Sequence, residues 1–199
     1  MLITLEGIDG SGKSTLHAAL HEALADLDPV FTREPGATWI GDAVRRAVAE
    51  RMDPIAEALL FVADHAAHID TVIRPALGEG RIVISDRYSD SRFAYQPVVL
   101  AGLLPDPLGW LRQMHDGWSI RPGRTFLFVL PVEEALRRIA AKKQEYFEEA
   151  TILEAVQKNY LDLAAADPSR FVLVDALLEK EEIFGFVADE IRRCARSSR

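Results

Sequence analysis

Residues 2–16 of the chain, LITLEGIDGSGKSTL, decide its fold. The first part, residues 2–6, is a short apolar run with β-branched residues, which predicts a buried strand. The last part opens an alanine- and leucine-rich run with helical spacing, residues 14–26. The turn between them fits the pattern G-x4-G-K-S/T without a mismatch. A strand, this turn and a helix in succession indicate a phosphate-binding P-loop, whereas a simple glycine-rich helix cap needs no such pattern.

The composition of the turn matches phosphate chemistry. Glycines allow successive backbone N–H groups to point at one anion, and the helix N-terminus adds partial positive charge. Lys13 is expected to reach the β- and γ-phosphates, and Ser14 to ligate Mg2+. We therefore expect ATP with Mg2+ to bind here. The expected ATP-binding residues are Gly7, Ile8, Asp9, Gly10, Ser11, Gly12, Lys13, Ser14 and Thr15.

Outward from the P-loop, short apolar runs alternate with segments of helical spacing. Further strands are predicted at residues 30–33, 82–85, 125–130 and 171–174. Helices are predicted at residues 40–51, 54–76, 132–143, 145–166 and 179–196, and a loop-rich insertion with one helix-like stretch at 97–123. This alternation predicts an α/β fold in which helices cover both faces of a five-stranded parallel sheet. We expect one domain over residues 1–199.

The bulk composition excludes several classes of protein. The 31 acidic residues outnumber 23 lysines and arginines, giving a net charge of −8, whereas general nucleic-acid binders are usually basic. No apolar run reaches the roughly 18 residues of a membrane span, and no signal peptide is evident. The single cysteine, Cys194, cannot form an intramolecular disulfide. We expect a cytoplasmic protein with neither nucleic-acid nor membrane partners.

Two polar stretches follow predicted strands, TREPGAT at residues 32–38 and DRYSDSRFAYQ at 86–96. Ligands bind at the carboxyl ends of parallel strands, so Arg33 and Glu34 are expected to face the crevice. Asp86 ends a strand, where a carboxylate can hold Mg2+ or its water. Arg87 offers the bidentate fork that suits an acceptor phosphate. Phe61 in the predicted helix 54–76 offers a ring for a base, with core packing as the alternative.

Together these residues resemble the thymidylate kinase family. The stretches EGIDGSGKST, TREPG, AEALLF-A and DRY-x2-S-x2-AYQ occur in the family's order and at about its spacing. Weaker similarity at PGRTFLFVLPVEEALRRI, YFE and NYLDLA extends the resemblance over nearly the whole chain. The resemblance implies transfer of the γ-phosphoryl group of ATP to dTMP, giving ADP and dTDP. It also implies a three-layer α/β/α P-loop NTPase fold, a short lid at about residues 140–147, and a homodimer.

The resemblance further implies roles for individual residues. Asp9 lies near the acceptor's sugar and phosphate, Arg87 binds the dTMP phosphate, and Tyr95 rejects a 2′-hydroxyl. The implied substrate-binding residues are Asp9, Arg33, Glu34, Pro35, Phe61, His65, Arg87, Ser91, Tyr95 and Gln96. The catalytic candidates are Asp9, Lys13, Arg87 and Arg92, and the metal candidates are Ser14 and Asp86.

Four features depart from the family pattern, among them Val129 and Ala37, and two of the four keep alternatives open. His65 stands where the family usually has an arginine that hydrogen-bonds the pyrimidine. The lid segment lacks the family's run of arginines, so a catalytic arginine would come from Arg137, Arg138 or Arg92. The alternatives are a kinase for another deoxynucleoside monophosphate and a non-kinase regulatory protein that binds nucleotides. The second phosphate site argues against a switch, which has no need of one.

Overall fold

The centre of the molecule is a sheet of five parallel strands in the order β2-β3-β1-β4-β5. The computed structural model describes residues 1–140 and 149–197. The strands are β1 (Leu2–Gly7), β2 (Val30–Arg33), β3 (Val83–Asp86), β4 (Arg124–Val129) and β5 (Phe171–Asp175). Leu5 of β1 lies opposite Asp86 of β3 and Phe126 of β4. The predicted five-stranded parallel sheet is confirmed, and β1 occupies its middle, so the P-loop emerges at the centre of the carboxyl edge.

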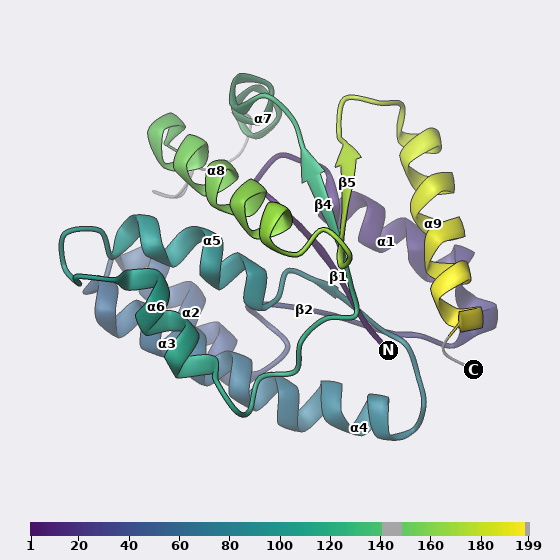
Figure 1. The fold of residues 1–199 in the computed structure, drawn as a ribbon, viewed down its shortest axis with the longest axis horizontal. Helices are drawn as coiled ribbons and strands as arrows, with labels where there is room; N and C mark the ends of the chain where they lie inside the picture. The colour runs from purple at the N-terminus through teal and green to yellow at the C-terminus, as the bar shows by residue number, and fades with distance from the viewer. Residues whose placement is uncertain (141–148, 198–199) are drawn as a thin grey trace.

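Helices cover both faces of the sheet, as double burial of apolar strands requires. On one side, α1 (Lys13–Ala23) packs against α9 (Lys180–Ser197); on the other, α5 (Ser89–Val99) packs against α8 (Ala150–Ala166) (Figure 1). The remaining helices are α2 (Trp39–Glu50), α3 (Pro54–His68), α4 (Arg74–Gly78), α6 (Pro107–His115) and α7 (Val132–Ile139). Among them α2 packs on α3, and α6 packs on α5. The three-layer α/β/α prediction is confirmed.

The helix predicted over residues 54–76 occurs in pieces. Asp53 caps α3 by accepting hydrogen bonds from the backbone N–H groups of Ile55 and Ala56, each at 3.0 Å. At Ile69–Ile73 the backbone hydrogen bonds change to the π-helical pattern, and α4 then continues to Gly78. Pro75 follows this widened turn and has no N–H for the carbonyl one turn earlier. The helical run therefore continues, but with an altered hydrogen-bond pattern.

Helix α5 was not predicted. The stretch after β3 alternates charged, hydroxyl and aromatic residues, and Pro97 lies inside the helix. The buried residues of α5 are mostly polar, including Ser91, Arg92 and Gln96, so the apolar periodicity that predicts a helix is missing. A helix whose buried face is polar is a candidate for a binding surface.

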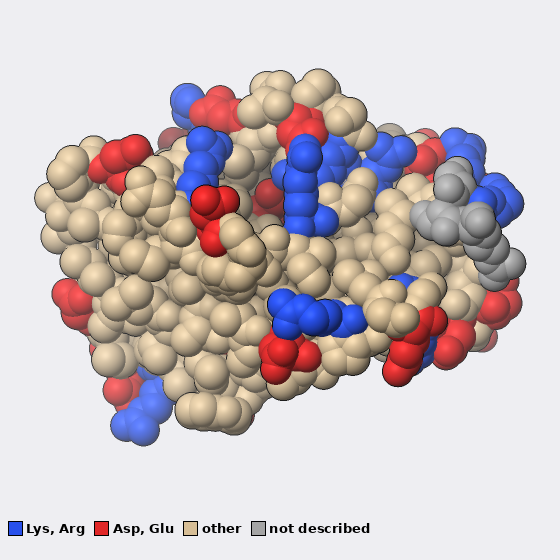
Figure 2. Space-filling model, turned by 60° about the horizontal axis from the view of Figure 1, so that its bottom comes forward, with Lys and Arg blue, Asp and Glu red and all other residues tan. Residues whose placement is uncertain are grey.

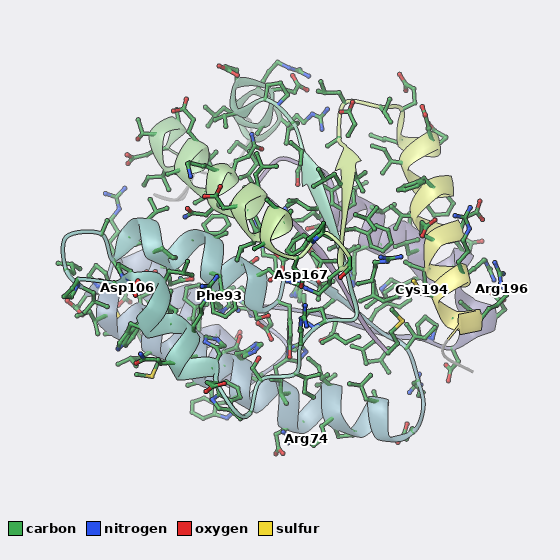
Figure 3. All side chains as sticks on the ribbon, viewed as in Figure 1. Arg74, Phe93, Asp106, Asp167, Cys194 and Arg196 are labelled. Carbon is green, nitrogen blue, oxygen red and sulfur yellow. The ribbon has the colours of Figure 1, made fainter. Side chains whose placement is uncertain are left out.

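The ends of two predicted helices lie outside the described residues. Helix α7 ends at Ile139 and α8 begins at Ala150. The end of the predicted helix 132–143, the start of the predicted helix 145–166 and most of the predicted lid at 140–147 fall in residues 141–148, outside the described residues. Within residues 1–140 and 149–197, no helix is long and apolar enough to cross a membrane. Cys194, labelled on α9 in Figure 3, is partly buried.

Candidate active site

The loop between β1 and α1 takes a shape that requires glycine. Gly7, Gly10 and Gly12 have φ values of 140°, 80° and 92°. A Cβ at Gly7 would lie 2.5 Å from the backbone oxygen of Phe128, and one at Gly10 would lie 2.5 Å from that of Ala135. Glycine alone tolerates both the backbone conformation and this close approach. The loop is therefore fixed between β4 and α7, with the N-terminus of α1 directly after it.

The side chain of Lys13 folds back over the loop. Its Nζ donates to the carbonyl of Ile8 at 2.8 Å and to the hydroxyl of Ser11 at 3.1 Å. The residue is only 4% exposed, and burial together with the nearby Arg87 lowers the pKa of its amino group to about 8. The ammonium group of Lys13 thus donates to two neutral acceptors within the loop. A negatively charged phosphate oxygen can replace these acceptors, and the resulting charged hydrogen bond is stronger.

We expect ATP binding to weaken at alkaline pH because of Lys13. Below its pKa of about 8 the amine is charged, and above it the loop loses its cation. Bound phosphate favours the charged form, so affinity is expected to fall by about tenfold per pH unit between about pH 8 and 10. Isothermal titration calorimetry of ATP across this range checks the slope. Lys13→Met is expected to bind weakly with a flat profile, and an equal slope in both proteins would contradict the assignment.

Ser14 and Asp86 form an oxygen-lined position beside the loop. The Ser14 hydroxyl donates to Oδ2 of Asp86 at 2.6 Å, and Oδ1 of Asp86 is buried without a partner among the described residues. Asp86 ends β3, the strand next to β1. A hydroxyl and a carboxylate are hard oxygen ligands of the kind Mg2+ takes. The two residues therefore fit a magnesium ion bound with nucleotide phosphates.

Arg87 joins the loop to α5. Its backbone φ is 67°, an uncommon conformation for a residue with a side chain, and its N–H donates to the carbonyl of Leu5 at 3.0 Å. The guanidinium donates through Nη2 to Asp9 and through Nη1 to the carbonyl of Gly7 at 3.2 Å. The hydroxyl of Tyr95 donates to the other Asp9 oxygen at 3.0 Å. Burial opposes ionisation of Asp9, but Arg87 and Lys13 outweigh it and lower the Asp9 pKa.

Glu34, at the end of β2, is a buried anion with three cationic or polar partners. It accepts from Nδ1 of His65 at 2.9 Å, from Nδ1 of His68 at 2.7 Å, and from Nη2 of Arg92 at 2.7 Å. Because an ionised carboxylate only accepts, both histidines carry a proton on Nδ1. Burial alone would raise the pKa of Glu34, but His65, His68 and Arg92 together hold it well below the usual value.

Many of these groups line one cavity of about 360 Å³, but Lys13, His65 and His68 are not part of its lining. Its lining includes nine of the ten substrate-binding candidates, both metal candidates, and Arg92: Asp9, Ser14, Arg33, Glu34, Pro35, Phe61, Asp86, Arg87, Ser91, Arg92, Tyr95 and Gln96. His65 is the exception: it is fully buried, and its Nε2 lies 2.9 Å from the hydroxyl of Ser119. His65 lies behind the cavity wall and donates to Glu34, which itself lines the cavity.

Two lining residues on α2 were missed by sequence reasoning. Arg45 and Val48 line the cavity, and Nη1 of Arg45 donates to the carbonyl of Pro35 at 3.0 Å. Their spacing of three residues places them on one helix face, but it is indistinguishable from ordinary helix amphipathicity. No signal in the sequence marked them as part of a site.

The arginine candidates for catalysis lie in different places. The guanidinium carbon of Arg92 lies 4.4 Å from the ring centroid of Phe61, and Nη2 bonds Glu34. Arg137 and Arg138 both pair with Glu134 on α7.

The protein has a net negative charge, yet both basic and acidic side chains surround a hollow in the upper part of the face in Figure 2. Of the charged side chains that line the cavity, four are arginines and three are carboxylates: Arg33, Arg45, Arg87, Arg92, Asp9, Glu34 and Asp86.

Comparison with known proteins agrees with this geometry. The sequence model of the family described as Thymidylate kinase matches residues 5–187. A "Probable thymidylate kinase" of Methanoculleus marisnigri is 77% identical over 200 residues, covering 100% of this chain and 98% of the relative. Proteins of the same name from Methanospirillum hungatei and Methanocorpusculum labreanum are 56% and 54% identical, covering 96% and 98% of this chain and 94% and 100% of their own lengths.

Proposed function

Because the chain belongs to the thymidylate kinase family, we propose that it transfers the γ-phosphoryl group of Mg-ATP to dTMP, giving ADP and dTDP for dTTP synthesis. One observation carries the proposal: P-loop residues Asp9 and Ser14 line the same cavity as the guanidinium of Arg87. A donor phosphate on the loop and an acceptor phosphate on Arg87 would meet in that cavity. Phosphoryl transfer depends mainly on such positioning and on charge neutralisation.

In the donor half, the backbone of residues 7–15 cradles the ATP phosphates and Lys13 pairs with the β- and γ-phosphates. Ser14 and Asp86 would hold Mg2+, which neutralises phosphate charge when bound. The unpartnered Oδ1 of Asp86 supports this assignment.

In the acceptor half, Arg87 holds the dTMP phosphate with one oxygen aimed at the γ-phosphorus. That oxygen forms the new P–O bond while the bond to the β–γ bridging oxygen breaks, and ADP leaves with the electron pair. Asp9 orients Arg87, and the hydroxyl of Tyr95 donates to Asp9. We propose that the Tyr95 ring crowds a 2′-hydroxyl and so favours a deoxyribose. Phe61 offers its ring to the base. The other proposed contacts are Arg33, Glu34, Pro35, Ser91 and Gln96, which share the same cavity.

We also propose a homodimer in the cytoplasm. The surface of the α2–α3 pair carries large apolar side chains at Trp39, which is 79% exposed, and at Met52 and Leu59. We propose that a second copy of the chain covers these exposed side chains. Sedimentation equilibrium tests the dimer, and Trp39→Glu is expected to shift it toward monomer; a monomeric wild-type protein would contradict this proposal.

ADP production from Mg-ATP, with dTMP, dUMP, dCMP, dGMP and UMP supplied separately, tests the proposed function. We expect turnover that requires an acceptor and is fastest with dTMP. Turnover confined to another acceptor would support a kinase of altered base specificity. ADP production at the same rate with each acceptor and with none would contradict a kinase and favour a nucleotide-binding regulatory protein.

A further inference from the structure

A second hollow, of about 430 Å³, lies on a different face of α5 from the active-site cavity. Its walls come from α5, α6, the segment 116–122 and the end of α8, and they include Phe93 and Asp167, both labelled in Figure 3. Among the described residues, the two hollows share no lining side chain. Arg121 and Arg170, which precede β4 and β5, place this second hollow toward the amino ends of these strands, away from the carboxyl edge that carries the P-loop.

His115 of α6 brings an unused hydrogen-bond acceptor to this second hollow. The residue is 5% exposed, and its Nδ1 donates to the carbonyl of Leu111 at 2.7 Å. Burial lowers the pKa of the ring to about 4, so near neutral pH Nε2 carries no proton and can only accept. Nε2 is buried and has no hydrogen-bond partner among the described residues. A buried acceptor without a partner costs free energy, and a ligand N–H at this position removes that cost.

One of the three arginines that line the second hollow is left for a ligand. Arg170 donates to both carboxylate oxygens of Asp90, and Arg121 pairs with Asp167. Arg112, exposed on α6, makes no hydrogen bond or ion pair through its side chain within residues 1–140 and 149–197. The hollow therefore offers one unpaired guanidinium to an anion.

Asp116 and Phe93 supply the remaining contacts that a ligand could use. The carboxylate of Asp116, exposed directly after α6, likewise has no partner in the part of the chain that the structure describes. Carboxylates in nucleotide sites accept hydrogen bonds from sugar hydroxyls. Phe93 is partly buried, with its ring centroid 5.2 Å from that of His115, and an aromatic ring of this kind can stack on a base.

We propose that the second hollow binds a nucleoside monophosphate, at a site separate from phosphoryl transfer. The phosphate pairs with Arg112, a sugar hydroxyl donates to Asp116, and a base N–H donates to His115 beside Phe93. Arg112 and His115 are three positions apart, so they lie on one face of α6, and Asp116 follows at its end. A monophosphate suits this charge pattern, because a triphosphate would bring more negative charge than one unpaired arginine can match. The proposal goes beyond the kinase activity and does not depend on it.

Calorimetry with the active site already filled tests the proposal. Protein holding one equivalent of dTMP and an excess of the β,γ-imido analogue of ATP is titrated with AMP and, separately, with UMP. We expect at least one of the two to bind at one equivalent per chain, and the comparison shows which base the site prefers. Arg112→Ala removes a charged hydrogen-bond donor and is expected to weaken this binding by about 10-fold or more. His115→Phe keeps an aromatic ring without the acceptor and is expected to weaken it by up to about 10-fold.

Two contrasting variants locate the binding. Arg87→Ala alters the active-site cavity and is expected to leave this affinity unchanged, as is Arg74→Ala, which removes an exposed arginine paired with Asp70. Thermal unfolding shows that each variant is folded. The dTMP-dependent turnover of Arg112→Ala is expected to match wild type, so the second hollow and the proposed function are tested separately.

Parts of the ligand separate recognition of a nucleotide from simple anion binding. Inorganic phosphate, and the nucleoside without phosphate, are each expected to bind at least about tenfold more weakly than the nucleotide. Inorganic phosphate that binds as tightly as the nucleotide would overturn nucleoside recognition. Absence of AMP and UMP binding, or one affinity shared by wild type, Arg112→Ala and His115→Phe, would overturn the site altogether.

Discussion

Replacing Arg87 with alanine is expected to lower kcat/KM for dTMP by about 1,000-fold or more, with little change in ATP affinity. The guanidinium of Arg87 lines the cavity directly beside the P-loop, where it donates to the carbonyl of Gly7, and we propose that it anchors the acceptor phosphate. Its loss removes that anchor and leaves the Asp9 carboxylate without its ion-pair partner. Steady-state kinetics at varied dTMP, with ATP binding by calorimetry, measure the two effects separately.

Two further variants sharpen this test of Arg87. Arg87→Lys restores the charge but not the bidentate fork, so we expect it to recover only part of the activity. Arg46→Ala removes an exposed arginine that pairs with Glu50 on α2, and its kinetics are expected to match wild type. Unchanged dTMP kinetics in Arg87→Ala would show that Arg87 does not bind the acceptor phosphate.

Replacing Glu34 with glutamine is expected to reduce the free energy of unfolding by about 3–5 kcal/mol, the range measured when one partner of a buried ion pair is removed. The variant leaves Arg92 buried without its counter-charge and weakens the bonds from His65 and His68. Urea denaturation near neutral pH measures the change. The control Glu50→Gln breaks an exposed pair with Arg46 and is expected to cost less than about 1 kcal/mol.

The effect of Glu34 on stability has a definite pH dependence. Its folded-state pKa lies well below the unfolded value of about 4.3, so its stabilisation is fully present above the unfolded pKa. That stabilisation is lost as pH falls below about 4.3 toward the folded pKa. The stability gap between wild type and Glu34→Gln is therefore expected to narrow on acidification. A gap of constant size down to strongly acidic pH would show that the carboxylate's charge is not the stabilising feature.

Local signals made the sheet and the P-loop predictable. Each strand is a short, mostly apolar run that ends at a glycine or a polar residue or, for β4, just before Pro131. The P-loop has fixed spacing, so β1, the loop and α1 were predicted within a few residues. Helix α5 was missed because its buried residues are mostly polar, so the sequence lacks the apolar periodicity that predicts a helix.

The Glu34 cluster could not be read from the sequence. Its members come from the residue after β2, from α3 and from α5, far apart along the chain, and only the fold brings them within hydrogen-bond distance. The sequence suggested His65 as a contact of the base, because the family resemblance aligned it with such a residue. The structure puts that side chain behind Glu34 and puts Arg92 on the cavity wall instead. The position of a residue in a motif cannot show whether its side chain lines the cavity or lies behind a residue that does.

The fate of a labelled γ-phosphate tests most directly whether this cavity joins a donor to an acceptor. ATP carrying the label is incubated with the protein, Mg2+ and dTMP, and the products are separated. We predict that the label appears in dTDP, in amounts equal to the ADP formed, and that Arg87→Ala abolishes most of this transfer. Label released as inorganic phosphate at the same rate with and without dTMP would contradict phosphoryl transfer and leave only nucleotide binding.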